Sequence, residues 1–283
     1  ITRQIFIEKS LKNVEDDIAS VNEIFRIQNA RELEENEKKY LPCNSSTSKA
    51  FILAASQGNL GSITKNEPKT LIKVKGETIL SSQVTKLKKV GINQITVIRG
   101  FKKNKIKIPS LTFVDNDEYK DTDELYSLFC AKDGLEGNIV VSYGDIIYRS
   151  YILNDLINDS NDITLIADAD FNPRDANRDF IKTDRKYSKM LLGTAVKLQK
   201  ISNNLPLTEI SGEFIGLFKA NSTGTNIIKQ TIDELSQNSD FSKMTLIDLF
   251  NEIIKKHPIA VKFIKGSWLD IDTVSDLQKA NNS

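Results

Sequence analysis

The sequence has few of the residues on which much enzyme chemistry depends. Among 283 residues there is one histidine, His257, and there are two cysteines, Cys43 and Cys130. A single histidine excludes most histidine-based triads and multi-histidine metal centres. The cysteines lie far apart without CxxC spacing, so we expect two reduced thiols, with neither a disulfide framework nor a zinc site. Catalysis by this chain would therefore rest on lysine, aspartate and backbone groups.

The sequence also lacks a strong net charge and a long hydrophobic run. The 39 Lys and Arg residues face 38 Asp and Glu residues, so the formal net charge is +1. No general field would then draw the chain to nucleic acid or to an anionic membrane. Apolar runs such as 51–55 are far shorter than the roughly 20 residues of a membrane helix, and no secretory leader is visible. We therefore predict a soluble, cytoplasmic protein, and the start at Ile1 instead of Met suggests a fragment of a longer one.

Residues 1–42 differ from the rest of the chain because they contain no glycine and carry a helical pattern. Their apolar residues recur at spacings of three and four, at Leu11, Val14, Ile18, Val21 and Phe25. This spacing predicts a helical segment whose apolar face needs a partner. The rest of the chain could cover that face, or another copy could do so in a homo-oligomer. Pro42 ends the pattern, and we predict a linker over 43–49 and one domain over 50–283.

From Ala50 onward, short β-rich runs alternate with helical stretches. We predict strands at 50–55, 94–99, 111–114, 138–142 and 162–167, with helices between them at 79–90, 123–133 and 151–159. Such alternation indicates an α/β fold with βαβ crossovers, a mainly parallel sheet, helices on both faces, and ligands at the carboxyl ends of the strands. The second half is less regular, with strands expected at 190–198, 212–219 and 259–264 and helices at 226–235, 245–256 and from Thr273.

The loop after the first predicted strand has the composition of a phosphate-binding loop. Ser56, Gly58 and Gly61 would let backbone N–H groups approach a triphosphate, and Pro68 would hold Lys69 at a fixed place. A glycine-containing loop alone is weak evidence, because a plain turn has the same composition. The P-loop and Gly-x-Gly-x-x-Gly patterns are both unmatched, which disfavours a Walker NTPase and a Rossmann dehydrogenase.

Two groups of carboxylates add to this loop. Asp145 follows Gly144 at the carboxyl end of a predicted strand, where ligands are expected. Asp270 and Asp272 would share one side of an extended segment, although Asp272 could instead cap the last helix. The loop, Lys69 and these carboxylates would together supply a phosphate cradle, a cation and hard oxygen ligands for Mg²⁺.

A series of motifs runs from about Lys49 to Ala280. It consists of Leu53-Ala54-Ala55-x-x-Gly58, Thr64, Pro68-Lys69, Gly76, Gly91-Ile92, Gly144-Asp145 and Trp268-x-Asp270-Ile271-Asp272. In order and in residue type, this series resembles the nucleotidyltransferases that activate sugar phosphates or phosphocholine. Ser56 stands where most of that family has glycine, and Leu60-Gly61 occupies the region of an arginine that would ordinarily help to hold the triphosphate.

A second series of motifs accounts for both departures. It consists of Ala54-Ala55-Ser56-x-Gly58, Arg99-Gly100-Phe101-Lys102-Lys103, Ser142-Tyr143-Gly144-Asp145-Ile146, Arg178-Asp179 and Gly212-Glu213-Phe214-Ile215-Gly216-Leu217. This series looks like the nucleotidyltransferase half of fused phosphoenolpyruvate mutase proteins of phosphonate biosynthesis. Residues 1–42 are similar to the tail of the mutase domain that precedes this half. The mutase barrel is absent from this chain, so the resemblance implies an upstream mutase domain as a missing partner and no mutase activity here.

The resemblance implies a Rossmann-like nucleotidyltransferase sheet and a Mg²⁺-dependent transfer of CMP from CTP. The acceptor would be a small phosphonate, such as 2-aminoethylphosphonate or 2-hydroxyethylphosphonate, and pyrophosphate would be released. Lys69, Asp145 and Asp272 would be catalytic, with Asp145 and Asp272 as magnesium ligands and Asp270 as a further or alternative ligand. The implied nucleotide-binding positions are Leu53, Ala54, Ala55, Ser56, Gly58, Lys69 and Gly144. The candidates for acceptor binding are Arg149, Asp168, Arg178, Lys182 and Glu213.

Three alternatives stay open at this point. A sugar-phosphate or choline-phosphate nucleotidyltransferase shares the core chemistry and differs in the acceptor pocket. A glycosyltransferase also joins an α/β sheet to an Asp-based metal site, but it would not need Pro68-Lys69. A non-catalytic scaffold is favoured if the chain binds neither CTP nor Mg²⁺.

Overall fold

The computed structural model describes residues 48–58, 60–172, 178–188 and 195–282. These residues belong to one compact unit. The predicted helical segment 1–42 and most of the predicted linker 43–49 lie outside the described residues. Within the described ranges, none of the helices has the length and apolar character needed to cross a membrane.

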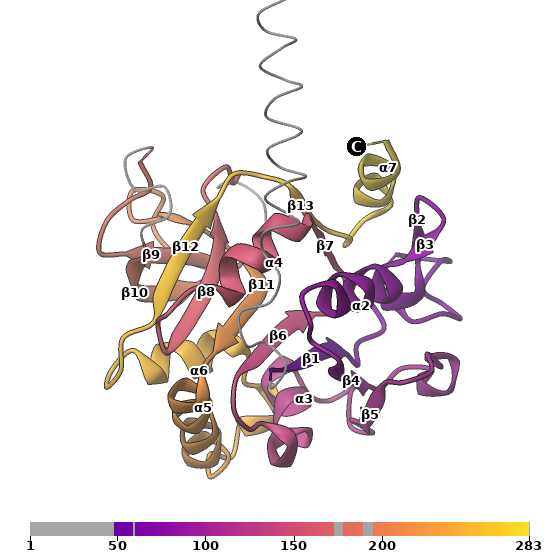
Figure 1. Cartoon of the computed structure of the whole chain (residues 1–283), viewed down its shortest axis with the longest axis horizontal. Coiled ribbons are helices and arrows are strands. Elements are labelled where there is room, and N and C mark those ends of the chain that lie inside the picture. Colours follow the sequence, from indigo (N-terminus) through magenta and orange to yellow (C-terminus); the bar gives the residue numbers. More distant parts are fainter. Residues whose placement is uncertain (1–47, 59, 173–177, 189–194, 283) are drawn as a thin grey trace, which may run out of the picture. The chain divides into compact units, whose positions relative to one another are not determined.

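The described strands and helices alternate along much of the chain (Figure 1). The strands are β1 (Lys49–Ala54), β2 (Lys73–Val74), β3 (Glu77–Thr78), β4 (Gln94–Arg99), β5 (Thr112–Asp115), β6 (Ile139–Tyr143), β7 (Ile146–Tyr148), β8 (Ile163–Asp168), β9 (Phe180–Thr183), β10 (Val196–Ser202), β11 (Gly212–Ala220), β12 (Ala260–Ile264) and β13 (Trp268–Asp270). The helices are α2 (Ile79–Lys89), α3 (Glu124–Cys130), α4 (Ser150–Ile157), α5 (Ser222–Leu235), α6 (Leu246–Ile253) and α7 (Val274–Asn282).

Nine of the described strands form one twisted sheet in the order β5-β4-β1-β6-β11-β8-β12-β10-β9. The strands from β5 to β6 all pair in parallel, and β12 pairs in parallel with β8. Strand β11 runs antiparallel to both of its neighbours, β6 and β8. The carboxyl ends of β1 and β6 therefore meet at one edge of the sheet, which is the place where an α/β sheet binds ligands.

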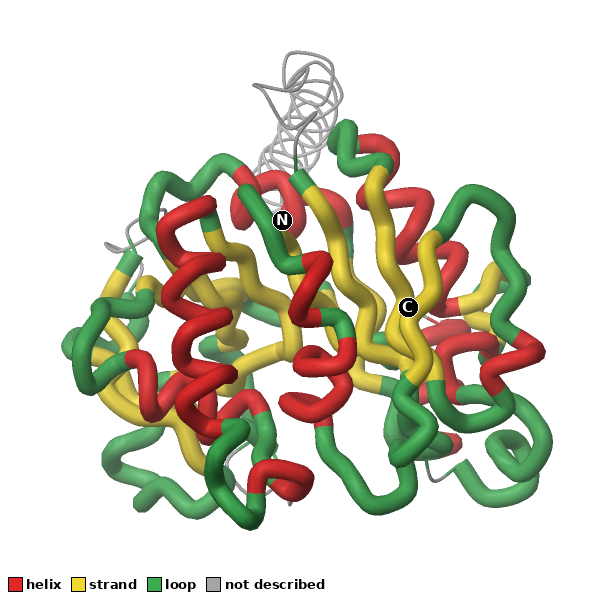
Figure 2. Tube along the Cα trace, turned by 90° about the horizontal axis from the view of Figure 1, so that it is seen from below, coloured by secondary structure: helices red, strands yellow, loops and turns green. Residues whose placement is uncertain are grey.

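The core divides into two parts because successive side chains of a strand point to opposite faces of the sheet. In β1, Ala50, Ile52 and Ala54 pack with the buried residues of α2 and α4. Phe51 and Leu53 pack on the other face with the buried residues of α3, α5 and α6. Helices thus cover both faces of the sheet, as Figure 2 shows from below. A strand buried on both faces needs the near-continuous hydrophobic sequence that β1 has.

The α/β architecture with helices on both faces is confirmed. Each strand and helix expected before residue 170 is present within one to three residues of its predicted ends, although the helix expected at 123–133 ends as α3 at Cys130 and continues as a short 3₁₀ turn. The parallel pairing that the sequence predicts holds for the strands from β5 to β6, while the antiparallel strands β9, β10 and β11 make the whole sheet mixed. The strand expected at 190–198 is β10, which begins at Val196. Cys130 is a free thiol, and Cys43 lies outside the described residues.

Candidate active site

Two hydrogen bonds of the Thr64 side chain help to shape the loop after β1. The Thr64 hydroxyl accepts a hydrogen bond from the Leu60 N–H (3.0 Å) and donates one to the Gly58 carbonyl (3.3 Å). Gly58 has a φ of +73°, a conformation that favours glycine. The predicted loop therefore has a defined shape, with small residues facing the edge of the sheet.

The segment after β6 approaches this loop closely. The Gly144 N–H donates to the Leu53 carbonyl (2.8 Å), and a Cβ at Gly144 would lie 2.7 Å from that same oxygen. Only glycine allows this approach, which brings Asp145 beside the end of β1. Gly144 thus has a structural reason to occupy its position.

Asp145, Asp270 and Asp272 come together although about 125 residues separate the first from the others. Strand β13 pairs antiparallel with β7, placing Asp270 opposite Ile146, the residue after Asp145. One carboxylate oxygen of each aspartate lies within 4.8 Å of the other two. Three carboxylates at such spacing can hold one hard divalent cation.

Lys69 lies among these three carboxylates. Its ammonium donates to Asp145 (2.8 Å) and Asp272 (2.5 Å) and lies 3.6 Å from Asp270. Only 5% of the Lys69 side chain is exposed. Burial disfavours the charged form, but the carboxylates outweigh burial and hold the pKa of Lys69 above its usual value. Lys69 is therefore a permanently charged group at the candidate metal site.

The donor set of this cluster fits Mg²⁺. The Oδ1 atom of Asp270 is buried and has no hydrogen-bond partner among the described residues. The Lys69 ammonium lies 3.6 Å from this oxygen, and a buried carboxylate oxygen is costly unless a cation completes its surroundings. Burial and the nearby Asp145 carboxylate raise the pKa of Asp270 to about 9. A divalent ion would relieve both the desolvation and the repulsion between carboxylates.

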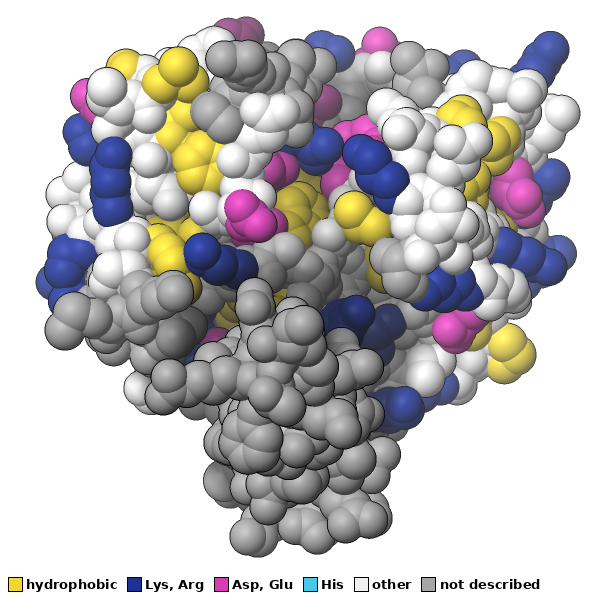
Figure 3. Space-filling view, turned by 90° about the horizontal axis from the view of Figure 1, so that it is seen from above, with side chains coloured by type: hydrophobic (Ala, Val, Ile, Leu, Met, Phe, Trp, Pro, Cys, Tyr) yellow, Lys and Arg dark blue, Asp and Glu magenta, His cyan; other side chains and the backbone are white. Residues whose placement is uncertain are grey.

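A cavity of about 560 Å³ joins the loop and the carboxylate cluster. Its lining includes Leu53, Ala55 and Ser56 from the loop side, together with four aromatic residues, Tyr119, Tyr143, Phe214 and Trp268. Its acidic residues are Asp123, Glu124, Asp145, Asp179, Glu213, Asp248, Asp270 and Asp272. Arg178 is the one basic residue of the described lining. Over the described part of the outer face in Figure 3, by contrast, basic and acidic side chains are interspersed.

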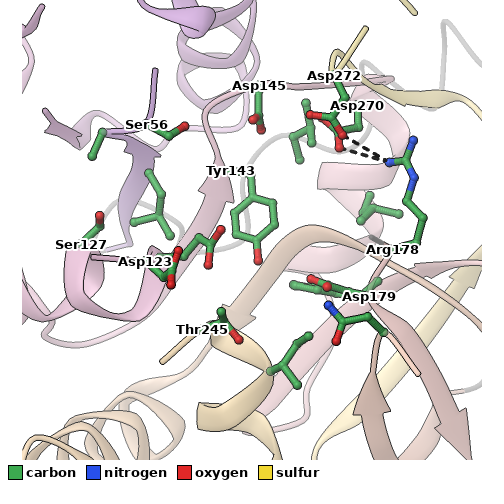
Figure 4. Close-up of a pocket in the computed structure, with 18 of the residues that line it drawn as sticks. Ser56, Asp123, Ser127, Tyr143, Asp145, Arg178, Asp179, Thr245, Asp270 and Asp272 are labelled. Atoms are coloured by element: carbon green, nitrogen blue, oxygen red, sulfur yellow. Dashed lines mark hydrogen bonds and ion pairs between the residues drawn. The ribbon is translucent and has the colours of Figure 1, made fainter. Parts of the chain in front are cut away.

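Five of these carboxylates lie in two groups that are separated by Tyr143 (Figure 4). Asp145, Asp270 and Asp272 lie on one side of the Tyr143 ring, while Asp123 and Asp179 lie on the other, toward which the Tyr143 hydroxyl points. We call Asp123, Glu124 and Asp179 the second acidic group.

The second acidic group contains two half-buried carboxyls, those of Glu124 and Asp179. Burial raises the pKa of Glu124 to about 7 against an opposing backbone hydrogen bond, and the charges of Asp123, Asp179 and Asp145 contribute less. Burial also raises the pKa of Asp179 to about 6, although the charge of Arg178 and a hydrogen bond from Tyr143 oppose the increase. Carboxyls that are desolvated in a cavity in this way are candidates for a functional site, since a cationic ligand would restore their charge.

A bulge in β11 seats the ring of Tyr143. The register with β8 shifts between Phe214 and Phe218, and Gly216 within the bulge has a φ of +75°. A Cβ at Gly216 would lie 2.2 Å from the Tyr143 ring. The Phe214 ring packs edge-on against Tyr143, with centroids 6.1 Å apart. The backbone of β11 and the packing of Phe214 together therefore fix the position of the Tyr143 ring.

Of the residues predicted to bind the acceptor, Arg178 and Glu213 line the cavity. Arg178 lies 3.1 Å from Asp270, 3.4 Å from Glu213 and 3.9 Å from Asp272. Arg178 therefore contacts the candidate metal ligands, and Glu213 is its partner at the start of β11.

The other three candidates for acceptor binding do not line this cavity. Asp168 accepts hydrogen bonds from the Trp268 indole (2.7 Å), the Gly266 N–H (3.0 Å) and the Asp170 N–H (2.8 Å). It therefore positions the segment that leads into β13. Lys182 pairs with Glu209 at 2.9 Å. Arg149 precedes α4, and its N–H donates to the Ser267 carbonyl. We leave these three residues out of the proposed acceptor site.

Sequence reasoning missed most of the second acidic group. Asp123 and Glu124 stand at the start of α3, where acidic residues are common for reasons of capping and helix dipole. Asp179 belongs to the Arg178-Asp179 motif, but nothing in the spacing of that motif indicates that Asp179 is buried. The one available signal was the sequence Asp-Glu after a predicted strand on the ligand-binding edge.

The sequence and the fold are similar to those of known proteins. No model of a known protein family matches the sequence. The chain is 29% identical over 254 residues to the CTP:phosphoglutamine cytidylyltransferase of Campylobacter jejuni, covering 81% of this chain and 97% of the relative. It is 29% identical over 111 residues to the 2-aminoethylphosphonate cytidylyltransferase of Lancefieldella rimae, covering 37% of this chain and 45% of the relative.

A solved structure shares the fold. The CTP:phosphocholine cytidylyltransferase of Streptococcus pneumoniae superposes with a TM-score of 0.67 at 24% identity, covering 83% of this chain and 98% of that one. The chain therefore has the nucleotidyltransferase fold, and the two sequence relatives named here are cytidylyltransferases.

Proposed function

We propose that this chain transfers CMP from CTP to a small phosphonate and releases pyrophosphate. One observation carries the proposal: the small-residue loop after β1, Lys69 and the three carboxylates lie together at one edge of the sheet. Phosphoryl transfer needs mainly positioning and charge neutralisation, and this arrangement offers both. The similarity to cytidylyltransferases supports CTP as the nucleotide.

The proposal assigns a role in the reaction to each part of the site. The backbone of 55–58 holds the nucleotide phosphates, and Lys69 neutralises their charge. Asp145, Asp270 and Asp272 would hold Mg²⁺, which supplies further neutralisation of the phosphates when it is bound. A phosphonate oxygen forms a bond to the α-phosphorus of CTP while the bond from that phosphorus to the β-phosphate oxygen breaks. No general base is needed, because the phosphonate oxygen already carries negative charge.

The second acidic group favours an acceptor with an ammonium group. Glu124 and Asp179 are desolvated carboxyls, and a primary ammonium has three N–H donors that can reach several carboxylate oxygens. The neighbouring Tyr143 ring would add a cation–π contact. We therefore place the amino end of 2-aminoethylphosphonate at Asp123, Glu124 and Asp179, instead of at Asp168. Its phosphonate would then lie toward Asp145 and Arg178.

Phosphocholine is the second candidate acceptor, and Tyr143 is the observation that favours it. An aromatic ring beside carboxylates also suits a trimethylammonium group. This group, however, has no N–H with which to donate hydrogen bonds to the carboxylate oxygens of Glu124 and Asp179. Sugar phosphates carry no positive charge and would leave the second acidic group without a counter-charge.

The proposal is tested by product analysis with CTP and Mg²⁺ and with four acceptors in parallel. These are 2-aminoethylphosphonate, 2-hydroxyethylphosphonate, phosphocholine and glucose 1-phosphate. We expect CMP-aminoethylphosphonate and pyrophosphate, with the highest kcat/KM for the amino compound. A higher kcat/KM for phosphocholine or glucose 1-phosphate would reject the phosphonate assignment. Failure to bind CTP at all would favour a scaffold, and transfer of a sugar from a nucleotide sugar would favour a glycosyltransferase.

A further inference from the structure

Lys69 occupies the centre of the candidate metal site instead of its border. The distances from its ammonium to Asp145, Asp272 and Asp270 are 2.8, 2.5 and 3.6 Å, so one nitrogen contacts all three carboxylates. These are the same side chains whose oxygens lie within 4.8 Å of one another. The ammonium therefore stands where the charge of a divalent cation is needed.

An ammonium and a divalent cation cannot share this position. Magnesium binds carboxylate oxygens at about 2.0–2.1 Å and demands a regular shell around itself. An ion coordinated by these oxygens would lie too close to the Lys69 nitrogen for two positive charges to coexist in a site that is only partly open to solvent. Binding of the ion thus requires the ammonium to leave the carboxylates.

A ligand bound along the loop after β1 would lie close enough to Lys69 to draw its ammonium away from the carboxylates. Gly58 packs directly against the aliphatic stem of Lys69, and a Cβ at Gly58 would lie 2.7 Å from Cδ of Lys69. A triphosphate bound along this loop would therefore lie beside the same side chain. Its oxygens would give the ammonium a second set of anionic partners within reach of a change in side-chain rotamer.

We propose that Lys69 is an internal counter-cation that competes with the divalent ion for Asp145, Asp270 and Asp272, and that the nucleotide relieves the competition by taking the ammonium. This proposal rests on the proposed function, because it assigns the loop to a nucleotide. Linkage then makes the effect reciprocal: the nucleotide strengthens metal binding, and the metal strengthens nucleotide binding by the same factor. The affinity of the protein for a metal ion is therefore low without CTP and higher when CTP is bound.

The test measures Mn²⁺ binding by electron paramagnetic resonance without nucleotide, in the full chain and its variants. Lys69→Met removes the competing charge and keeps the apolar stem. We expect this variant to bind Mn²⁺ about ten-fold more tightly than the wild type, because it removes the positive charge of a buried side chain that contacts all three carboxylates. The double variant Lys69→Met/Asp270→Asn should lose the gain, which assigns the bound ion to this cluster.

Lys262→Met is the matched control. Lys262 is also a buried lysine, and it forms ion pairs with Asp155 (2.7 Å) and Asp159 (3.7 Å), away from the cavity. Its Mn²⁺ affinity should equal that of the wild type. Lys69→Gln serves as a second variant if Lys69→Met does not fold, as judged by circular dichroism. An Mn²⁺ affinity in the folded Lys69 variant that is no higher than in the wild type overturns the proposal.

The same proteins separate this proposal from the proposed function. Wild-type protein that transfers CMP, together with an unchanged Mn²⁺ affinity in the Lys69 variants, rejects the competition alone. Tighter Mn²⁺ binding in the Lys69 variants, together with wild-type protein that transfers no CMP to any acceptor, rejects the proposed function and retains the competition at the carboxylates.

Discussion

At the scale of single residues, the candidate site depends on a few charged side chains. Lys69, Asp145, Asp270 and Asp272 were predictable from the sequence because each belongs to a short local motif. Arg178 was predictable as a cation of the site, but its contact with Asp270 was not. Glu124 and Asp179 were missed, because their burial arises from contacts between segments distant in sequence.

Asp145→Asn should lower kcat by about 10²–10³-fold, because the site loses one charged ligand of the metal and of Lys69. The fold should remain, since a neutral amide has nearly the same size. Steady-state kinetics at saturating Mg²⁺ checks the prediction. Asp115→Asn is the control, because Asp115 is also an aspartate at a strand end paired with arginine and lysine, but it lies outside the cavity. Comparable turnover in the folded Asp145 variant would remove Asp145 from the metal site.

Glu124→Gln should raise the free energy of unfolding at pH 8 by about 1–3 kcal/mol and change it little at pH 5. Burial raises the Glu124 pKa to about 7 in the folded protein, above the value of 4.5 for an exposed group. The stability contributed by the protonated form is therefore complete below about pH 4.5 and is lost as the pH rises through about 7. Chemical denaturation at both pH values measures the difference.

The exposed residue Glu67 provides the control for this prediction, because Glu67→Gln should give no pH-dependent gain. At pH 8, 2-aminoethylphosphonate should stabilise the wild type more than Glu124→Gln, since its ammonium compensates the buried charge. An equal stabilisation of both proteins would show that Glu124 does not face the amino group.

At the scale of elements, two strand contacts assemble the site. The β7–β13 pairing joins Asp145 to Asp270 and Asp272, and the bulge of β11 seats Tyr143. The sequence predicts β6 and β11 because both are long runs rich in apolar residues. It does not predict β7 and β13, which have three residues each and owe their pairing to tertiary contacts.

Gly216→Ala should lower the free energy of unfolding by roughly 2–4 kcal/mol, combining the strain of a positive φ with overpacking against Tyr143. Its φ is +75°, and the added Cβ would lie 2.2 Å from the ring. Gly266→Ala is the control, because Gly266 also has a positive φ, of +58°, but a Cβ there would contact nothing within 4 Å. We expect the control to cost only about 1 kcal/mol.

Acceptor kinetics extend the test of the β11 bulge. If Gly216→Ala folds, the KM for the acceptor should rise more than the KM for CTP, because the displaced ring borders the second acidic group. Equal losses of stability in the Gly216 and Gly266 variants would contradict the account of the bulge.

At the scale of the whole molecule, the sequence predicted the α/β class, the helices on both faces and the strand edge that holds the site. The sequence did not determine the order of the later strands in the sheet. Strands β9 and β10 pair antiparallel, and the rule for βαβ crossovers applies only to parallel strands. The candidate site lies wholly within the described part of 50–283.

Deletion of residues 1–42 should leave CMP transfer measurable, with kcat within about three-fold of the full chain, because every residue of the candidate site lies later in the sequence. We propose that this segment is a docking element, so its removal should change association or solubility. Kinetics and light scattering on both chains check the two parts. Complete loss of CTP binding by a soluble, folded truncation would contradict the assignment.

The most direct test of the central claim is the identification of the product formed from CTP, Mg²⁺ and 2-aminoethylphosphonate by ³¹P NMR and mass spectrometry. The account predicts equal amounts of CMP-aminoethylphosphonate and pyrophosphate, with Asp145→Asn forming almost none. No transfer to this phosphonate by the wild type, together with efficient transfer to phosphocholine or to a sugar phosphate, would contradict it.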